Sequence, residues 1–360
     1  MMFKKHLKSL LVLAFSLFVV LFSTSLIAQE KAADTNIEAK KEEEPTLKPS
    51  DLIMEHIMDN HEFHIAEING QVIAIPLPVI LYSQQKGVSV FMSSKFEHGK
   101  AIYNGYTLSE KGVIEAEDKS EQVFDFSLTR NVVQMILALA LLVYLVIGAA
   151  KKYQNGGVKV APTGFQNALE PIITFIRDEV GKSNLGHKYE RYMPYLLTVF
   201  FFILINNIIG LIPGTANVTG NIAFTLVLAV ISLLVILFST NGHFWLHIFW
   251  PPGVPFLVKF ILIPVELLGV FIKPAALMIR LFANMVAGHI VITCFILLIF
   301  IFGAMSNVAG WGFSPVSIAF TVFIYFIEIL VAFIQAFIFT NLTAVFIGQA
   351  IEGAHDEAHH

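Results

Sequence analysis

The sequence predicts an all-α polytopic membrane protein with five transmembrane helices, preceded by a small exported α+β module. The composition is the first reason: 56% of the 360 residues are hydrophobic and only 14% are charged, whereas about a quarter are charged in soluble domains. The second is the arrangement of the apolar residues. After Asn131 they form successive runs of about twenty residues, the length that crosses ~30 Å of hydrocarbon.

The composition also argues against several kinds of chemistry. The formal net charge of −4 gives no reason to expect a nucleic-acid partner. Cys294 is the only cysteine, so the chain can build neither a disulfide framework nor a cysteine metal site. The sequence contains no Gly-rich phosphate-binding loop, and we expect no cofactor.

Residues 1–28 have the layout of a signal peptide. Lysines near the start precede an apolar core from Leu10 to Leu26, and Ala28 offers a cleavage position. An uncleaved anchor helix is the alternative. In both cases the lysines stay inside and the following segment is exported.

Residues 29–51 are expected to form a charged linker, and residues 52–126 a small exported module. The expected elements of the module are one short helix and two strands: Leu52–Met58, Gln71–Ser83 and Val88–Phe96. Pro76 and Pro78 make the first of these strands an edge strand or an irregular one.

Four histidines in this module are candidate metal ligands: His56, His61, His64 and His98. Their spacing matches no closed tetrahedral site, so we favour a polar, hydrated helix and predict no metal centre. The C-terminal residues 351–360 are also His-rich, but they are short and are interpreted as a cytoplasmic tail.

The membrane domain is expected over residues 127–350. Its five spans are Asn131–Ala150, Tyr192–Ile212, Asn221–Thr240, Phe256–Gly303 and Ser314–Gln349. Lys151 and Lys152 directly follow the first span, which places that side in the cytoplasm, the N-terminal module outside and the C-terminus inside. Phe165–Val180 is too short and too charged to span, and we expect it at the cytoplasmic interface.

The last two spans are expected to form a long, tilted helix hairpin. As one helix, the 48 residues of Phe256–Gly303 would extend ~72 Å, so this segment must tilt, kink or break, with Pro264 and Pro274 as the places to do so. Gly310–Gly312 is the expected external turn.

This hairpin carries an arginine at membrane depth. Arg280 lies far from both ends of its apolar run, and its guanidinium stays protonated in proteins. A charge at the bilayer centre costs ~2.5–3.5 kcal/mol or more. We therefore expect Arg280 to face protein or water rather than lipid.

Other ionisable groups lie at defined levels relative to this arginine. If the turn of the antiparallel pair is centred near Asn307 and Val308, His289 is level with Glu328, and Arg280 is level with Gln335. An imidazole and an acid at one depth can exchange protons near neutral pH. Glu266 lies on the cytoplasmic side, so ionisable groups flank the fixed cation on both sides.

Small residues surround the arginine on one helical face. Ala276, Ala283 and Ala287 lie at positions −4, +3 and +7 from Arg280. Small residues let another helix approach closely in a membrane. A helix of a partner subunit is the favoured interpretation, and packing within the chain is the alternative.

Four blocks of the sequence resemble the ATP synthase subunit a family. The residues from Arg280 to His289, RLFANMVAGH, closely resemble the family signature R-L-F-x-N-M-x-A-G-[EH]. The other blocks are the stretch from Pro264 to Pro274, the stretch from Asn206 to Pro213, and QAFIF from Gln335 to Phe339. Some members carry the acid at the position of His289 and the histidine at that of Glu328; in this chain the two are exchanged.

The resemblance implies the proton-translocating stator subunit of a rotary F-type ATP synthase in a bacterial inner membrane, with the N-terminal module in the periplasm and ATP chemistry on other subunits. The implied partners are a ring of c subunits at the alanine face, peripheral-stalk b subunits and the lipid bilayer. Protons would pass through two half-channels separated by Arg280, which Gln335 would orient. The implied path residues are His289, Glu328, Gln335, Asn284, Asn207 and Glu266.

Simpler roles stay open for some of these residues. His289 and Glu328 could form a structural pair, Asn207 could bend its helix, and Glu266 could be an interface residue. A secondary transporter using Arg280 for an anionic substrate would normally show two repeated halves, and the Arg280 block has no second copy. A secreted binding module held by a membrane anchor is a third alternative, but five spans are more than an anchor needs.

Overall fold

A computed structural model describes the chain over residues 59–68, 71–96, 99, 101–109, 112–118, 121–156, 164–212, 215–240, 242–250 and 255–352. The predicted signal peptide and linker lie outside these residues. So do the predicted helix Leu52–Met58 and the tail beyond Glu352.

The described part of the N-terminal module consists mainly of short β-strands. They are β1 Glu62–Ile68, β2 Gln71–Pro76, β3 Pro78–Ser83, β4 Gly87–Met92, β5 Tyr106–Leu108, β6 Ile114–Ala116 and β7 Val123–Asp125. They pair antiparallel in three small sheets, with the orders β1-β2, β4-β3-β7 and β5-β6. The hydrophobic core of the module contains Val79, Leu81, Phe96, Tyr106 and Ile114.

The segment expected as one strand from Gln71 to Ser83 is interrupted at Leu77, between the two prolines. The prediction of an irregular strand is therefore confirmed, but an edge position is wrong for β3, which lies between β4 and β7. The sheet tolerates Pro78 because proline is accepted as the first residue of a strand, and its carbonyl still accepts a bond from the Leu128 N–H.

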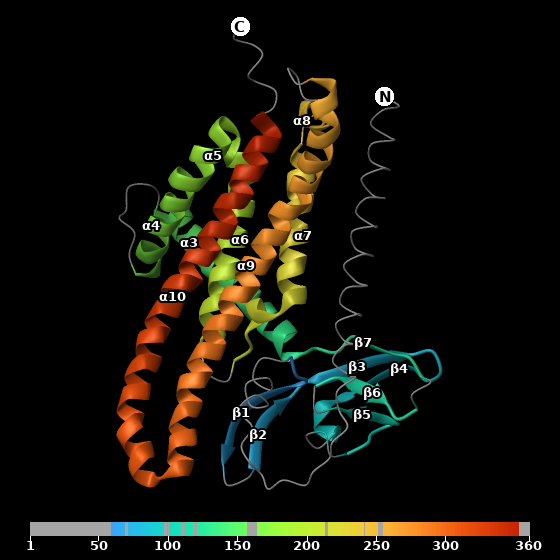
Figure 1. The fold of residues 1–360 in the computed structure, drawn as a ribbon, viewed down its shortest axis with the longest axis vertical. Helices are drawn as coiled ribbons and strands as arrows, with labels where there is room; N and C mark the ends of the chain where they lie inside the picture. The colour runs from blue at the N-terminus through green and yellow to red at the C-terminus, as the bar shows by residue number, and fades with distance from the viewer. Residues whose placement is uncertain are drawn as a thin grey trace. The chain divides into compact units, whose positions relative to one another are not determined.

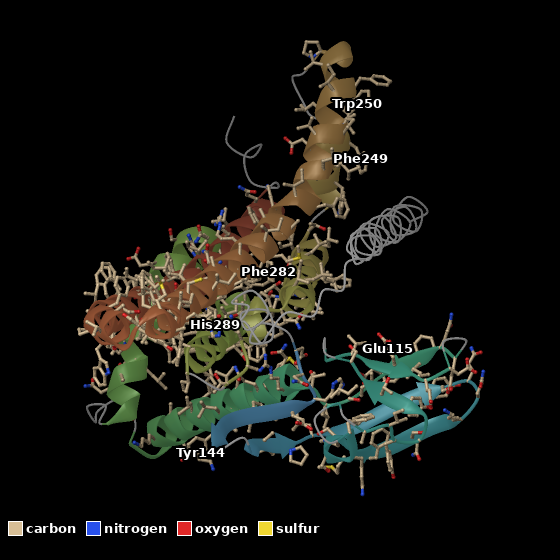
Figure 2. The ribbon with its side chains drawn as sticks, turned by 60° about the horizontal axis from the view of Figure 1, so that its bottom comes forward. Glu115, Tyr144, Phe249, Trp250, Phe282 and His289 are labelled. Atoms are coloured by element: carbon tan, nitrogen blue, oxygen red, sulfur yellow. The ribbon has the colours of Figure 1, made fainter. Side chains whose placement is uncertain are left out.

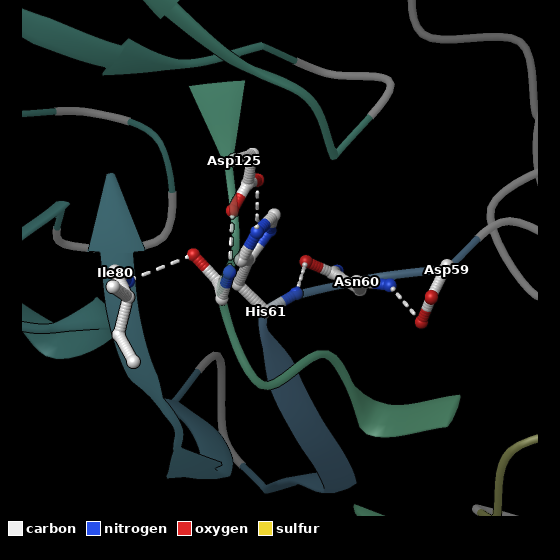
Figure 3. A network of polar contacts seen from close by, with 6 residues as sticks. Asp59, Asn60, His61, Ile80 and Asp125 are labelled. Atoms are coloured by element: carbon white, nitrogen blue, oxygen red, sulfur yellow. Dashed lines mark hydrogen bonds and ion pairs between the residues drawn. The ribbon is translucent and has the colours of Figure 1, made fainter. Parts of the chain in front are cut away.

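The hydrated helix expected around the histidines is wrong at His61, which directly precedes β1 and is buried. His61 is 4% exposed, and its Nε2 lies 2.8 Å from Oδ2 of Asp125 (Figure 3). The Asp125 carboxylate gives the imidazole a partner, which makes its burial tolerable. His64 lies within β1, whereas His56 and His98 lie outside the described residues. Among the described residues, no group of three or more metal-ligating side chains could hold an ion.

The rest of the described chain is helical. The α-helices are α3 Arg130–Gly156, α4 Phe165–Phe175, α5 Ser183–Leu185, α6 Tyr189–Gly210, α7 Ile222–Ser239, α8 Gly242–Phe249, α9 Phe256–Met305 and α10 Asn307–Glu352. A π-helical turn, η2 Ile176–Lys182, follows α4, and 3-10 turns occur at Ser93–Phe96 (η1), Gly186–Lys188 (η3) and Val218–Gly220 (η4).

Five helical stretches of the described chain are long and apolar enough to cross a membrane, which confirms the predicted number of spans. Four of them correspond to α3, α7, α9 and α10. The remaining stretch runs from α4 through α6, and α6 agrees with the span expected at Tyr192–Ile212. The start of α7 is fixed by Asn221, whose side chain accepts a hydrogen bond of 2.9 Å from the Ala223 N–H.

The C-terminal hairpin forms as predicted, but its turn lies elsewhere (Figure 1). Helix α9 ends at Met305 and α10 begins at Asn307, so the turn is at Ser306 and not at Gly310–Gly312. The Ser306 backbone is extended, and its hydroxyl accepts a hydrogen bond of 3.1 Å from the Ala309 N–H. A serine that caps a helix start therefore defines the turn, and the glycines lie inside α10.

Helix α9 is continuous through Pro264 and Pro274. A break is therefore excluded among the three ways in which this segment could fit a bilayer. An α-helix of 50 residues extends ~75 Å, more than twice the ~30 Å hydrocarbon core, so tilt and bending have to accommodate the excess.

Helices α6 and α7 pack beside the hairpin and complete the membrane core. The core includes Phe200 and Ile203 of α6, Leu277 and Leu281 of α9, and Phe339 of α10, all nearly or fully buried. Helix α3 joins this bundle through Gln134, whose amide donates to the Ala216 carbonyl and accepts from the Ala216 N–H. The loop between α6 and α7 thereby fixes the first span.

Candidate ion-translocation site

Helix α9 has one buried face and one exposed face around Arg280. Leu277, Leu281 and Met285 point into the bundle and are at most 2% exposed. The other face is exposed from one helical turn before the arginine to two turns after it, at Ala276, Arg280, Ala283, Asn284 and Ala287. Packing of the alanines within the chain, the alternative considered above, is therefore excluded for the described residues.

Arg280 itself is exposed on this face. Among the residues that the structure describes, its guanidinium has no hydrogen bond or ion pair. Gln335 of α10 is 2% exposed, and its Oε1 accepts a hydrogen bond of 2.9 Å from Nδ2 of Asn284. In this structure Gln335 therefore binds Asn284, one helical turn from Arg280, and the bond expected between Gln335 and Arg280 is not formed.

Glu328 lies where the antiparallel pairing predicts it. Its side chain is 7% exposed and lies against Gly288, where a Cβ atom would overlap the carboxyl group. The next residue, His289, is half-buried on α9 (Figure 2). Glu328 and His289 thus come from facing helices at one level, and the missing side chain of Gly288 creates the space for the carboxyl group.

Asn207 of α6 joins the same level from a third helix. It is fully buried, and its Nδ2 donates a hydrogen bond of 3.3 Å to the carbonyl of Ala332, one helical turn from Glu328 on α10. A second link comes from Asn217, which donates from Nδ2 to the Met285 carbonyl at 3.3 Å. Asparagine side chains therefore line both the α9 and the α10 side of this region.

Three buried oxygen atoms in this region lack a hydrogen-bond donor among the described residues: Oδ1 of Asn206, Oδ1 of Asn207 and Oε2 of Glu328. Buried side-chain polar atoms are paired in the large majority of cases. Several acceptor oxygens that lack a donor in one region can bind ordered water or a mobile proton. The described residues thus leave acceptor atoms unsatisfied close to a buried carboxyl group.

The part of α9 that precedes Arg280 carries a different set of groups. Glu266 is exposed on α9, two helical turns from Lys273. Lys273 donates a hydrogen bond of 3.1 Å to Oε1 of Gln349, and its ammonium group lies 4.9 Å from the centre of the Phe346 ring. Lys273 thus contacts the C-terminal part of α10, whereas Glu328 of α10 lies against Gly288, on the other side of Arg280.

The sequence did not identify the contributions of Gly288, Asn217 and Gln349. Gly288 was visible as part of the signature, but its role depends on which side chain faces it from α10. Asn217 lies in a loop and Gln349 near a helix end, where polar residues are common and give no signal.

An exposed row of small residues around a membrane-depth cation, with a buried acid and unpaired acceptors beside it, defines an ion-translocating membrane protein. Comparison with known proteins gives the particular family. Residues 132–348 match the family ATP synthase A chain, so the chain belongs to that family. Residues 52–134 match a separate domain family of unknown function, DUF8433.

Curated relatives support the assignment. The ATP synthase subunit a of Chloroherpeton thalassium is 48% identical over 243 residues, which is 66% of this chain and 71% of the relative. ATP synthase subunit a 2 of Prosthecochloris aestuarii is 46% identical over 244 residues, 66% of this chain and 73% of the relative. ATP synthase subunit a of an Anaeromyxobacter species is 38% identical over 245 residues, 65% and 57% of the two chains.

The chain is therefore a multi-pass membrane protein that serves as the proton-translocating stator subunit of an F-type ATP synthase. ATP chemistry resides on other subunits of that synthase.

Proposed function

We propose that protons cross this subunit through two half-channels that meet at Arg280 on the exposed face of α9. The observation that carries the proposal is the face itself. It presents a permanent cation among small residues, and this cation is unpaired within the described chain. A surface of this kind is complementary to a small-residue helix that carries a carboxylate.

The outer half-channel runs past Asn207, Glu328 and His289. The burial of Glu328 against Gly288, the contact of Asn207 with the neighbouring turn of α10, and the unpaired oxygens of both residues support this path. An acid and an imidazole at one level can pass a proton along without a fixed net charge. Asn284 and Gln335, which bond to each other, continue this polar path toward Arg280.

The inner half-channel runs past Glu266 toward the cytoplasm. Glu266 is exposed on the same helix as Arg280, and Lys273 lies between them. A carboxylate near the membrane boundary can accept a proton from the partner and release it to water.

The partner at the α9 face is the ring of c subunits, each with one membrane carboxyl group. A proton from the outer half-channel neutralises a ring carboxylate, which can then rotate into lipid, and the inner half-channel receives the proton after nearly a full turn. Arg280 attracts the ionised carboxylate and separates the half-channels. The driving force includes ~2.3 kcal/mol per proton per 100 mV of membrane potential.

The subunit lies in a bacterial inner membrane with the strand module in the periplasm and the C-terminus in the cytoplasm. Lys151 and Lys152 at the end of the first span support this orientation. Peripheral-stalk b subunits hold it against rotation.

The test is ATP-driven acidification of vesicles that contain the assembled synthase. For Arg280→Ala, we expect coupled pumping to disappear, the complex to assemble, and passive proton leak through the membrane sector to rise, because the barrier charge is gone. Arg191→Ala is the matched control, since Arg191 lies on α6 outside the proposed path. Coupled pumping by an assembled Arg280→Ala complex would refute the proposal.

A further inference from the structure

One face of the three-stranded sheet in the N-terminal module is apolar and exposed. The strand register places alternate side chains of β3 and β4, with those of β7 and the residue after it, on this face. We call it the apolar sheet face; it consists of Ile80, Tyr82, Val88, Val90, Met92, Phe124 and Phe126. Val88 is 67% exposed, and Val90 and Phe126 are each 66% exposed.

The two faces of this sheet differ in burial, because successive side chains of a strand point to opposite faces. Val79 and Leu81 point to the other face, are fully buried and form the core of the module. The apolar sheet face carries no Asp, Glu, Lys, Arg or His. The nearby Lys86 pairs with Glu121 at 3.1 Å. Soluble proteins rarely expose contiguous apolar patches beyond a few hundred Å², and larger ones mark contacts with proteins or membranes.

Hydrogen bonds connect this sheet directly to the start of the first span. The Phe126 N–H donates to Ile80 at 2.9 Å and the Leu128 N–H donates to Pro78 at 3.2 Å, so pairing with β3 continues beyond β7. The Arg130 N–H, at the first residue of α3, donates to the carbonyl of Asn60, which lies just before β1 of the neighbouring sheet, at 3.0 Å. Arg130 follows Phe126 by four positions, a distance of at most ~14 Å.

The first span also exposes apolar side chains. Leu137 and Tyr144 of α3 are 59% and 75% exposed. The end of the sheet at Pro78 and Met92 is the end to which the chain leading into α3 is bonded. The apolar sheet face is therefore tethered within a short distance of the boundary of the bilayer that α3 enters.

We propose that the apolar sheet face lies on the lipid bilayer, with its side chains at the boundary between headgroups and acyl chains. Tyrosine and phenylalanine suit this depth, and the valines of β4 add apolar area. Because the face has no charged side chain, burial of area and not attraction to anionic lipid holds it there, and the contact is insensitive to salt. The module thus contacts the membrane surface next to the first span.

The proposal is tested by lipid quenching in the assembled synthase with the full chain. A single cysteine at Val90, in a Cys294→Ser background, carries a fluorophore in phosphatidylcholine vesicles with brominated acyl chains. Tyr144→Cys on α3 serves as the lipid-facing reference and Glu115→Cys on β6 as the water-facing reference (Figure 2). We expect quenching at V90C to exceed clearly that at E115C, to be lower than or equal to that at Y144C, and to be unchanged by added salt.

Quenching at V90C no greater than at E115C would overturn the proposal. Protection of V90C from a water-soluble maleimide without lipid quenching would also overturn it, and would indicate that residues 49–58 or a second protein chain covers the face.

A second variant tests whether apolar burial causes the contact. Val90→Asp should lower the quenching of a fluorophore at V88C, because an aspartate resists transfer to the acyl boundary. Unchanged quenching at V88C would contradict burial as the cause.

Discussion

At position 288 the absence of one carbon atom decides how two helices meet. Gly288 of α9 leaves the volume that the Glu328 carboxyl group of α10 occupies. A glycine inside a helix is normally unfavourable by roughly 0.5–1 kcal/mol relative to alanine. Its occurrence here is explained by the close approach of an acidic side chain at membrane depth.

Gly288→Ala is therefore expected to lower ATP-driven acidification per assembled complex and to lower the thermal stability of the subunit. The new methyl group would displace Glu328 from its position between the helices. Gly148→Ala on α3 is the control, because a Cβ there would meet no atom within 4 Å and should be neutral or slightly stabilising. If the two variants behaved alike, Gly288 would not position Glu328.

The carboxyl group of Asp125 should make the stability of the N-terminal module depend on pH. Burial raises its pKa, but the hydrogen bonds from His61 and Ser127 outweigh burial and hold the pKa below its ordinary value. A lowered folded-state pKa means that the stabilisation is present above the unfolded-state pKa of ~3.9 and is lost as the pH falls through the folded-state value. The module should therefore lose stability only below about pH 4.

Hydrogen-exchange protection of β7 and β1, corrected for intrinsic rates, measures this effect. Asp125→Asn should reduce protection at neutral pH and flatten its acid dependence. Glu115→Gln, an exposed acid on β6, is the control and should leave the profile unchanged. An acid dependence that survives in Asp125→Asn would assign it to another group, such as Glu121, whose pKa the hydrogen bond from Ser83 lowers.

Among the helices, capping and buried polar contacts decide where elements begin and how they attach. The apolar pattern was sufficient to predict the number of spans because spanning a bilayer requires long apolar runs. The external turn expected at Gly310–Gly312 is wrong, since Ser306 caps α10 while Gly310 and Gly312 continue as helix. The apolar pattern also missed α8 and most of the short strands, whose few residues carry too weak a periodic signal.

Substitution of Gln134 tests whether its hydrogen bonds to Ala216 hold the first span, α3, against the rest of the bundle. Gln134→Leu would leave the buried N–H and carbonyl of Ala216 without their partner, at a cost of roughly 1–3 kcal/mol. We expect a lower thermal unfolding midpoint of the purified subunit. Leu137→Ala, at an exposed position on the same helix, should change it little. Equal midpoints for Gln134→Leu and wild type would mean that α3 is held by other contacts.

For the whole molecule, the proposed transport machinery and the strand module belong to separate family matches. The ATP synthase family covers residues 132–348, and all residues proposed for the proton path fall within it. The module matches a domain family of unknown function over residues 52–134. We therefore expect proton translocation and the proposed contact of the module with lipid to be separable.

Deletion of residues 60–126 should leave ATP-driven acidification per assembled complex close to that of the full chain. The physical reason is that none of the residues proposed for transport lies in the module. Arg280, His289 and the exposed alanines lie on α9, Glu328 lies on α10, and Asn207 lies on α6. The same deletion with Arg280→Ala should abolish pumping and serves as the negative control. An assembled deletion complex without pumping would show that the module takes part in transport.

The sequence alone determined the membrane class, the five spans, the hairpin and the family, because hydrophobic run length and the signature around Arg280 are local properties of the chain. It also predicted that Glu328 and His289 lie at one depth, because counting from a turn near Asn307 and Val308 pairs these two positions. Only the tertiary structure decided that Glu328 packs against Gly288, that Gln335 bonds Asn284, and that His61 is buried against Asp125. These contacts depend on helix rotation and strand register, which residues distant in the sequence set jointly.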